Sequence, residues 1–119
     1  MITMSLKLLP LSVSEANVQL STRPLSGDST VQIGWSVSEE DGGALRAGFS
    51  TWDGYVSPFK TLDYDEILLV LEGYFGFELE CGQRFEGGPG TTMRIHKNTP
   101  VRYFGEHAKV FFVITPPSE

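Results

Sequence analysis

The stretch at residues 65–77, with the sequence DEILLVLEGYFGF, constrains the fold of this chain more than any other. Its apolar run at 67–71 is too short for an isolated helix and contains both Ile and Val, which favours a strand buried on both faces. Glu72 and Gly73 then interrupt the run before a second apolar segment begins at 74–77. Because glycine readily adopts the backbone angles of a tight turn, the pattern predicts an antiparallel hairpin with Glu66 at the mouth of its first strand.

Short strands separated by turn signals are expected along the rest of the chain. Thirteen glycines and seven prolines are spread over 119 residues, which suits one all-β domain spanning residues 1–119. Residues 1–17 are predicted to form an N-terminal arm, with a helical turn at 14–17. Frequent short strands favour a closed barrel or a two-sheet sandwich, because closure removes exposed strand edges. The other predicted strands are 18–20, 31–37, 44–53, 83–86, 91–95, 100–104 and 108–115, with turns at 38–43, 81–82, 96–99 and 105–107.

The charge of the chain limits its partners. Nine basic and fifteen acidic residues give a formal net charge of −6 at pH 7. Nucleic acid and anionic membranes would repel such a surface, so we expect neither as a partner. No apolar run approaches the roughly 18 residues needed to span a bilayer, and the N-terminus lacks a small-residue cleavage site. Cys81 is the only cysteine, so no internal disulfide can form, and we expect a cytoplasmic protein.

Two spacings in the chain resemble those of the cupin superfamily. Six residues separate Glu66 from Gly73, as in the first conserved cupin stretch. The second stretch runs glycine, five residues, proline, one residue, glycine, two residues, histidine, and a block of this spacing begins here at Gly90. Asn98 stands where that stretch has its second glycine. The resemblance covers about residues 44–115 and implies a cupin double-stranded β-helix, or jelly-roll barrel.

Within this superfamily the chain is most similar to the C-terminal cupin domain of the EutQ family of ethanolamine-utilisation proteins. The similar segments are AGFSTW at 47–52, LDYDEILLVLEG at 62–73 and GPGTTMRI at 88–95. The resemblance implies an association with the metabolism of ethanolamine or related small amines, and an acetate-kinase-type activity is attached to the family. Because this sequence contains no recognisable nucleotide-binding motif, the kinase activity is not carried over to it.

The usual cupin metal ligands are mostly replaced in this chain. Metal-binding cupins place histidines six and four residues before the glutamate and a third histidine in the second block. Here Lys60, Leu62 and Val101 occupy these positions, and only Glu66 remains of the four usual ligands. One carboxylate lacks the nitrogen donors that give such sites their affinity for transition metals. EutQ-like cupins resemble this chain in lacking the histidines, so we expect a metal-independent protein without a cofactor.

Glu66 is the strongest candidate for a catalytic group. A carboxylate pointing into a barrel has few water contacts, and burial of this kind raises a pKa toward values that suit proton transfer. The alternative is a structural glutamate neutralised by Lys60, which could itself bind an anionic ligand. Tyr64, two residues before Glu66, is the second catalytic candidate, with half-buried packing as its alternative role.

Trp52 and Tyr103 complete the predicted site together with Lys60 as ligand-binding residues. Trp52 shares a strand face with Ser50, so its ring could form the floor of a pocket or belong to the core. Tyr103 has the same parity as Val101, which points it inward.

These residues predict a small-molecule ligand in the barrel pocket, with acid/base chemistry at Glu66 such as an isomerisation. The alternative is a non-catalytic ligand-binding or assembly module of a metabolic pathway. We also expect a homodimer, because residues 67–71 are apolar on both faces whereas one layer of a sandwich needs only one buried face. His96 and His107 are assigned to exposed turns, and Arg102 to solvent or a partner subunit.

Overall fold

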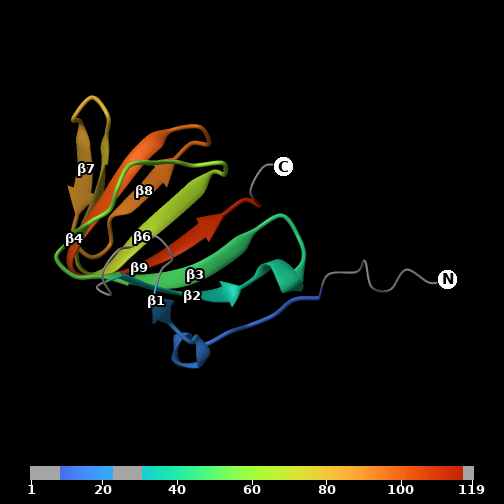
Figure 1. The fold of residues 1–119 in the computed structure, drawn as a ribbon. Helices are drawn as coiled ribbons and strands as arrows, with labels where there is room; N and C mark the ends of the chain where they lie inside the picture. Colours follow the sequence, from blue (N-terminus) through green and yellow to red (C-terminus); the bar gives the residue numbers. More distant parts are fainter. Residues whose placement is uncertain (1–8, 23–30, 117–119) are drawn as a thin grey trace.

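The computed structural model describes residues 9–22 and 31–116, and these residues form the predicted all-β fold. Their only helical elements are two short 3-10 helices, η2 (Glu15–Asn17) and η3 (Glu39–Asp41), and neither could cross a membrane. The strands are β1 (Ser21–Thr22), β2 (Val31–Val37), β3 (Arg46–Trp52), β4 (Tyr55–Val56), β5 (Lys60–Thr61), β6 (Glu66–Leu79), β7 (Arg84–Gly87), β8 (Thr92–Ile95) and β9 (Pro100–Ile114). The nine described strands join one hydrogen-bonded sheet that folds over into two layers (Figure 1).

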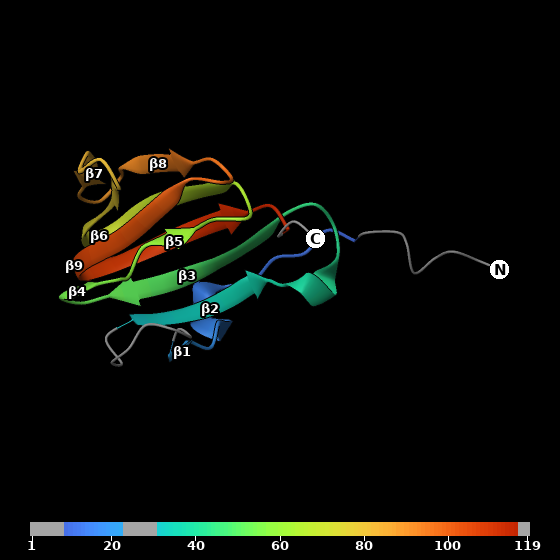
Figure 2. The same cartoon turned by 45° about the horizontal axis from the view of Figure 1, so that its top comes forward.

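The two long strands β6 and β9 run through both layers. They pair antiparallel from Glu66 opposite Ile114 to Leu79 opposite Val101. The first half of β6 also pairs with β8 and its second half with β7, while β9 pairs with β5 and β4 near its start and with β3 near its end. Beyond β3 the sheet continues through β2 to β1 (Figure 2). This sharing of strands between two layers is the jelly roll that the cupin resemblance implies.

Both long strands bend at one corner of the barrel. The hairpin turn predicted at Glu72 and Gly73 and the turn predicted at 105–107 are wrong, because β6 and β9 continue through these positions. The register of β6 against β9 shifts there, Gly73 has φ 73° and His107 has φ 48°. A Cβ atom at Gly73 would overlap the carbonyl group of His107. The glycine therefore belongs to a bulge that lets the paired strands bend together from one layer into the other.

Side chains alternate between inside and outside along the first half of β6. Leu68 and Val70 are 3% and 1% exposed, whereas Ile67 is 48% exposed. The prediction that residues 67–71 are buried on both faces is therefore wrong for the single chain, because the second layer covers only the inner face. The core residues are Val31, Trp52, Leu62, Leu68, Val70, Phe75, Phe77, Met93, Ile95, Val101, Tyr103, Ala108, Val110, Phe112 and Ile114.

The predicted arm, residues 1–17, is described from residue 9 onward. The predicted helical turn is confirmed by η2, which Ser14 caps with its side chain. Glu15 forms an ion pair with Lys109 of β9 at 2.7 Å. After η2 the chain passes close to β2. A Cβ atom at Gly34 of β2 would lie 2.6 Å from the carbonyl oxygen of Gln19. The described part of the arm is therefore held to the barrel by the ion pair of Glu15, while its apolar side chains Leu9, Leu11 and Val13 remain exposed.

The predicted turn at 96–99 is also present, between β8 and β9. Asn98 has φ 72° in this turn, and its N–H donates to the carbonyl of Leu62 at 2.7 Å. This left-handed conformation favours glycine, and asparagine tolerates it better than most other residues. The backbone therefore explains why asparagine can occupy the position of a cupin glycine.

Candidate ligand-binding site inside the barrel

The two layers of the barrel line a cavity of about 840 Å³. This volume lies within the range of protein sites for drug-sized molecules. Strands β3, β5, β6 and β9 all contribute to its wall. The cavity brings together all five residues predicted for the site, which are Trp52, Lys60, Tyr64, Glu66 and Tyr103.

Glu66 is the first residue of β6 and belongs to the inner face of its layer. Its cross-strand neighbours are Ile114 of β9 and Ile95 of β8, both buried, and Glu66 itself is 8% exposed. The Tyr103 hydroxyl donates a hydrogen bond to Oε1 of Glu66 at 2.6 Å. Hydrogen bonds to carboxylates are shorter and stronger than those between neutral groups. A bound molecule would therefore meet a buried carboxylate with a phenol as its partner.

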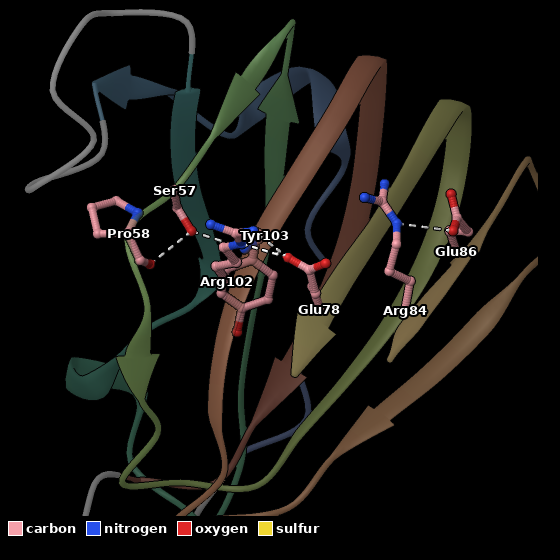
Figure 3. A network of polar contacts seen from close by, with 7 residues as sticks. All are labelled: Ser57, Pro58, Glu78, Arg84, Glu86, Arg102 and Tyr103. Atoms are coloured by element: carbon pink, nitrogen blue, oxygen red, sulfur yellow. Dashed lines mark hydrogen bonds and ion pairs between the residues drawn. The ribbon is translucent and has the colours of Figure 1, made fainter. Parts of the chain in front are cut away.

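Tyr103 is held by both its backbone and its ring. The Ser57 hydroxyl accepts the Tyr103 N–H at 2.8 Å and donates to the Pro58 carbonyl at 3.1 Å, and the Ser57 N–H donates to the Tyr103 carbonyl at 2.8 Å (Figure 3). The Tyr103 ring centroid lies 5.7 Å from that of Trp52 and 6.0 Å from that of Phe75. These contacts fix the direction of the hydroxyl group. Ser57 was missed from the sequence, because a serine in an expected loop gives no signal of this kind.

Trp52 ends β3 beside the corner of the barrel. It is 4% exposed, and its ring meets Phe75 edge-on at 5.6 Å between centroids. Because Trp52 belongs to the core and also lines the cavity, the two roles considered for it do not exclude each other.

Lys60 and Tyr64 stand at the rim of the cavity. The exposed Lys60 of β5 donates from Nζ to the hydroxyl of the half-buried Tyr64 at 3.5 Å. The same Nζ lies 5.5 Å from the centroid of the Tyr64 ring, within the range of a cation–π interaction. The pair thus places an ammonium group and a phenol in the cavity that contains the Glu66 carboxylate.

Among the cavity residues that were not predicted as part of the site, Arg46 brings a charge and Trp35 an aromatic ring. Arg46, the first residue of β3, and Trp35 of β2 both line the cavity. Trp35 is 43% exposed, and its ring meets that of Phe112 edge-on at 5.2 Å between centroids. Strand alternation does place Arg46 on the same face as Ser50 and Trp52, so a signal for it was present.

Three of the four cupin metal-ligand positions hold Lys60, Leu62 and Val101 in place of histidines. Leu62 and Val101 are both fully buried, and Val101 pairs with Lys60 across the β5–β9 ladder. Within residues 9–22 and 31–116, no three His, Cys, Asp or Glu side chains gather in a way that could hold a metal ion. One carboxylate without imidazole or thiolate donors does not fit a transition-metal site.

The two histidines and Arg102 do not line the cavity. His96 lies in an exposed turn, as predicted. His107 lies within β9 rather than in a turn, with Nδ1 3.2 Å from an oxygen of Asp53. Arg102 is half-buried on the outer face of its layer and forms an ion pair with Glu78 at 2.5 Å (Figure 3).

The jelly roll, its internal cavity and the two characteristic spacings define this protein as a cupin. Residues 3–119 match the family described as "Ethanolamine utilisation protein EutQ". The chain therefore belongs to the EutQ family.

Individual relatives agree with this assignment. The chain is 39% identical over 77 residues to the curated "Acetate kinase EutQ" of Salmonella typhimurium (strain LT2), and this alignment covers 65% of the chain and 32% of that protein. The chain thus spans about a third of the length of the curated relatives that it matches.

Solved structures show the same fold. The crystal structure of an ethanolamine utilization protein Q from Salmonella typhimurium LT2 has a TM-score of 0.79 at 27% identity, covering 91% of this chain and 86% of that one. The polyketide cyclase RemF from Streptomyces resistomycificus has a TM-score of 0.75 at 20% identity, covering 93% and 81%. At this lower identity the second similarity concerns the fold alone.

Proposed function

We propose that this EutQ-family cupin binds a small organic molecule in the barrel cavity and transfers protons on it through Glu66, without a metal ion. The observation that carries this proposal is the 2.6 Å hydrogen bond from the Tyr103 hydroxyl to the buried Glu66 carboxylate, in a cavity of about 840 Å³. A general base must lie within hydrogen-bond reach of the proton that it takes. A carboxylate in the cavity wall meets this condition for a molecule seated in the cavity.

Isomerisation is a reaction class that these side chains could carry out alone. Glu66 takes a proton from one carbon of the bound molecule and returns it to another, so the carboxylate is regenerated and no electrons leave the substrate. Tyr103 stabilises the carboxylate through its hydrogen bond, and Tyr64 provides a second hydroxyl group. Lys60 supplies a positive charge to the ligand, and Trp52 supplies an apolar wall.

Metal independence is supported by the donor set. An ammonium group and two aliphatic side chains stand in place of the three cupin histidines, so the imidazole nitrogens that bind transition metals are lacking. Elemental analysis of the purified protein should find no stoichiometric zinc, nickel, iron or manganese. One such ion per chain, with turnover lost on chelation, would contradict this part of the proposal.

Acetate kinase activity is not extended to this chain. The curated relatives carry that name, but the chain corresponds to about a third of their length. Phosphoryl transfer needs cationic groups and metal ions on the phosphates, and the sequence has no GxxxxGK[ST] loop. Release of ADP from ATP in the presence of acetate by the purified chain would show that the activity does reside in this domain.

A thermal-shift screen and one substitution test the proposal. Small amines, carboxylates and nucleotides are added to the protein, because a ligand that binds the native state raises its melting temperature. Glu66→Gln keeps the shape of the side chain and removes its charge, and Glu80→Gln at an exposed turn is the matched control. We expect turnover of a bound compound to be lost only in Glu66→Gln. Unchanged turnover in that variant would refute proton transfer by Glu66, whereas binding without turnover of any compound by the wild type would favour the non-catalytic ligand-binding or assembly module.

We further propose that the protein is a cytoplasmic homodimer. Four apolar side chains of β6 and β9 form an outer apolar strip, through the cross-strand pairs Ile67 with Val113 and Leu69 with Phe111. Ile67 is 48% exposed, and the other three are partly exposed. Because the strip carries no charge, two copies of a chain with a net charge of −6 could meet there without bringing like charges together.

A further inference from the structure

The cavity carries the opposite charge balance to the chain as a whole. The chain has a net charge of −6, yet among residues 9–22 and 31–116 the charged side chains that line the cavity are Arg46, Lys60 and Glu66. Two cations therefore face one carboxylate in a protein that is otherwise acidic. A site of this composition attracts anions and repels cations, and the low-dielectric wall strengthens both effects.

Strand register brings Arg46 to the same end of the barrel as Glu66. Ile114 of β9 is the cross-strand partner of Arg46 in β3 and also of Glu66 in β6. Directly opposed residues project to the same face of a sheet, so all three side chains lie on the inner face. Two strand spacings separate the backbone of Arg46 from that of Glu66 by about 10 Å. An anionic group beside Arg46 would therefore leave the rest of the molecule within reach of Glu66.

The rest of the cavity wall is largely apolar and aromatic. Trp35 and Phe112 pack edge-on at 5.2 Å, and Trp52 and Phe75 do so at 5.6 Å. All four rings line the cavity, together with aliphatic side chains such as Leu68. Such a wall binds an apolar body by removing its surface from water.

We infer that the ligand is an organic carboxylate with an aromatic or bulky apolar body, whose carboxylate is bound by Arg46 and Lys60. The inference rests on the proposed function, because it assumes that the cavity is the binding site. Arginine suits this role, since its planar guanidinium can donate two parallel hydrogen bonds to a carboxylate. Acetate offers no apolar body to a cavity of about 840 Å³, and an amine would bring a third positive charge to the two cations.

Four probes separate the contributions of charge and apolar body. Phenylacetate, 2-phenylethanol and 2-phenylethylamine share one aromatic body and carry a negative, a neutral and a positive head group, and acetate has the head group alone. Isothermal titration calorimetry should show phenylacetate binding more tightly than the other three probes by about tenfold or more, because hydrogen bonds to a charged group are stronger than those to a neutral one.

Two variants assign the effect to the named cations. Arg46→Gln and Lys60→Gln should each weaken phenylacetate binding about tenfold and change 2-phenylethanol binding less than about twofold. Arg94→Gln, at an exposed position of β8 outside the cavity, is the charge-matched control and should bind as wild type. Lys60 is exposed at the rim, so its variant remains informative if Arg46→Gln fails to fold.

The outcomes distinguish this inference from the proposed function. Equal or tighter binding of 2-phenylethylamine or 2-phenylethanol would overturn the inference and leave the cavity as a binding site. So would unchanged phenylacetate binding in both variants. If none of the four probes binds while another compound of the thermal-shift screen does, the inference alone is wrong. If no compound of either set binds, the proposed function is wrong as well.

Discussion

The hydroxyl group of Tyr103 lies 2.6 Å from Oε1 of Glu66 and links the two layers of the barrel through one hydrogen bond. Tyr103 belongs to the half of β9 that pairs with β4 and β5, whereas Glu66 belongs to the half of β6 that pairs with β8. The same contact therefore holds the layers together and positions the carboxylate in the cavity. A change to either residue is expected to affect both stability and ligand binding.

A double-mutant cycle measures this link. Tyr103→Phe removes the donor and leaves a buried carboxylate with one partner fewer, so we expect the free energy of unfolding to fall by about 1–3 kcal/mol. In a Glu66→Gln background the same substitution should cost less, which gives a coupling energy above about 1 kcal/mol in urea unfolding. Strictly additive effects of the two substitutions would show that the residues are not coupled.

The corner of the barrel allows a comparison between two glycines of nearly equal φ. Gly73 has φ 73° and lies against the backbone of His107, whereas Gly54 has φ 70° and open space where a Cβ would lie. Gly54→Ala should lower the free energy of unfolding by about 1–2 kcal/mol, because alanine disfavours the left-handed conformation. Gly73→Ala adds a clash with backbone atoms, so we expect a further loss of at least about 2 kcal/mol in urea unfolding. Equal losses would mean that the corner tolerates a side chain.

Asn98 tests whether the turn before β9 requires a left-handed residue. Asn98→Gly should leave the free energy of unfolding within about 0.5 kcal/mol of wild type or raise it, because glycine adopts φ 72° without strain. Asn98→Ala should lower it by about 1 kcal/mol, because a Cβ disfavours that conformation. Thermal or urea unfolding of the two variants measures the difference. Equal stability of the alanine and glycine variants would argue against a backbone role for this position.

The ion pairs of Lys109 predict a pH dependence of stability. Hydrogen bonds to Glu15 first, and to Glu72 second, raise the pKa of Lys109 above its ordinary value of 10.5. The charged form is thus stabilised by folding, so its contribution is fully present below pH 10.5 and is lost as the pH rises through the raised pKa of the folded state. Lys109→Gln should cost about 0.5–1 kcal/mol at pH 8.

Thermal unfolding of wild type and Lys109→Gln between pH 7 and pH 12 measures this effect. The gap between the two melting temperatures should narrow only at the alkaline end of the range. A gap that stays constant throughout would assign the effect of the substitution to packing rather than to charge.

The outer apolar strip predicts the oligomeric state. Light scattering after size exclusion should give twice the chain mass of 13.2 kDa for the wild type at micromolar concentration. Ile67→Lys places a charge in the strip without touching the core and should give a monomer, whereas Glu80→Lys at an exposed turn should not. A wild type that runs as a monomer would contradict the homodimer.

Local patterns in the sequence predict a strand well where the alternation of neighbouring side chains is enough to define it. The alternation of apolar and polar residues across 31–37 corresponds to β2, and the alternation across 44–53 contains β3. The cupin resemblance, which rests partly on the spacing from Glu66 to Gly73, implies that Glu66 points into the barrel. In the structure Glu66 is the first residue of β6 and is 8% exposed. Parity likewise points Tyr103 inward, because side chains alternate along a strand whatever its partners are.

The two mistaken turns show where local patterns fail. A hairpin turn and a bulge can both use a glycine with positive φ, so Glu72 and Gly73 give the same signal for either. Which of them forms depends on whether the neighbouring strand continues past the glycine, and here β9 does so at Glu106 and His107. For the same reason the exposure of Ile67 could not be predicted, since it depends on which face of the strand another layer covers.

The sequence by itself determined which chemical groups are available to the site: the carboxylate of Glu66 without the cupin histidines, the two cations Arg46 and Lys60, and several aromatic rings. It also determined which side chains share a face of each strand, because side chains alternate along a strand. Only the tertiary structure decided which of these groups meet. Residues 66 and 103 are 37 positions apart, and their hydrogen bond exists because β6 and β9 bend together and bring the Tyr103 hydroxyl of one layer within 2.6 Å of Oε1 of Glu66 in the other. Contacts of this kind follow from the closure and register of the barrel, and no periodicity within a single strand encodes them.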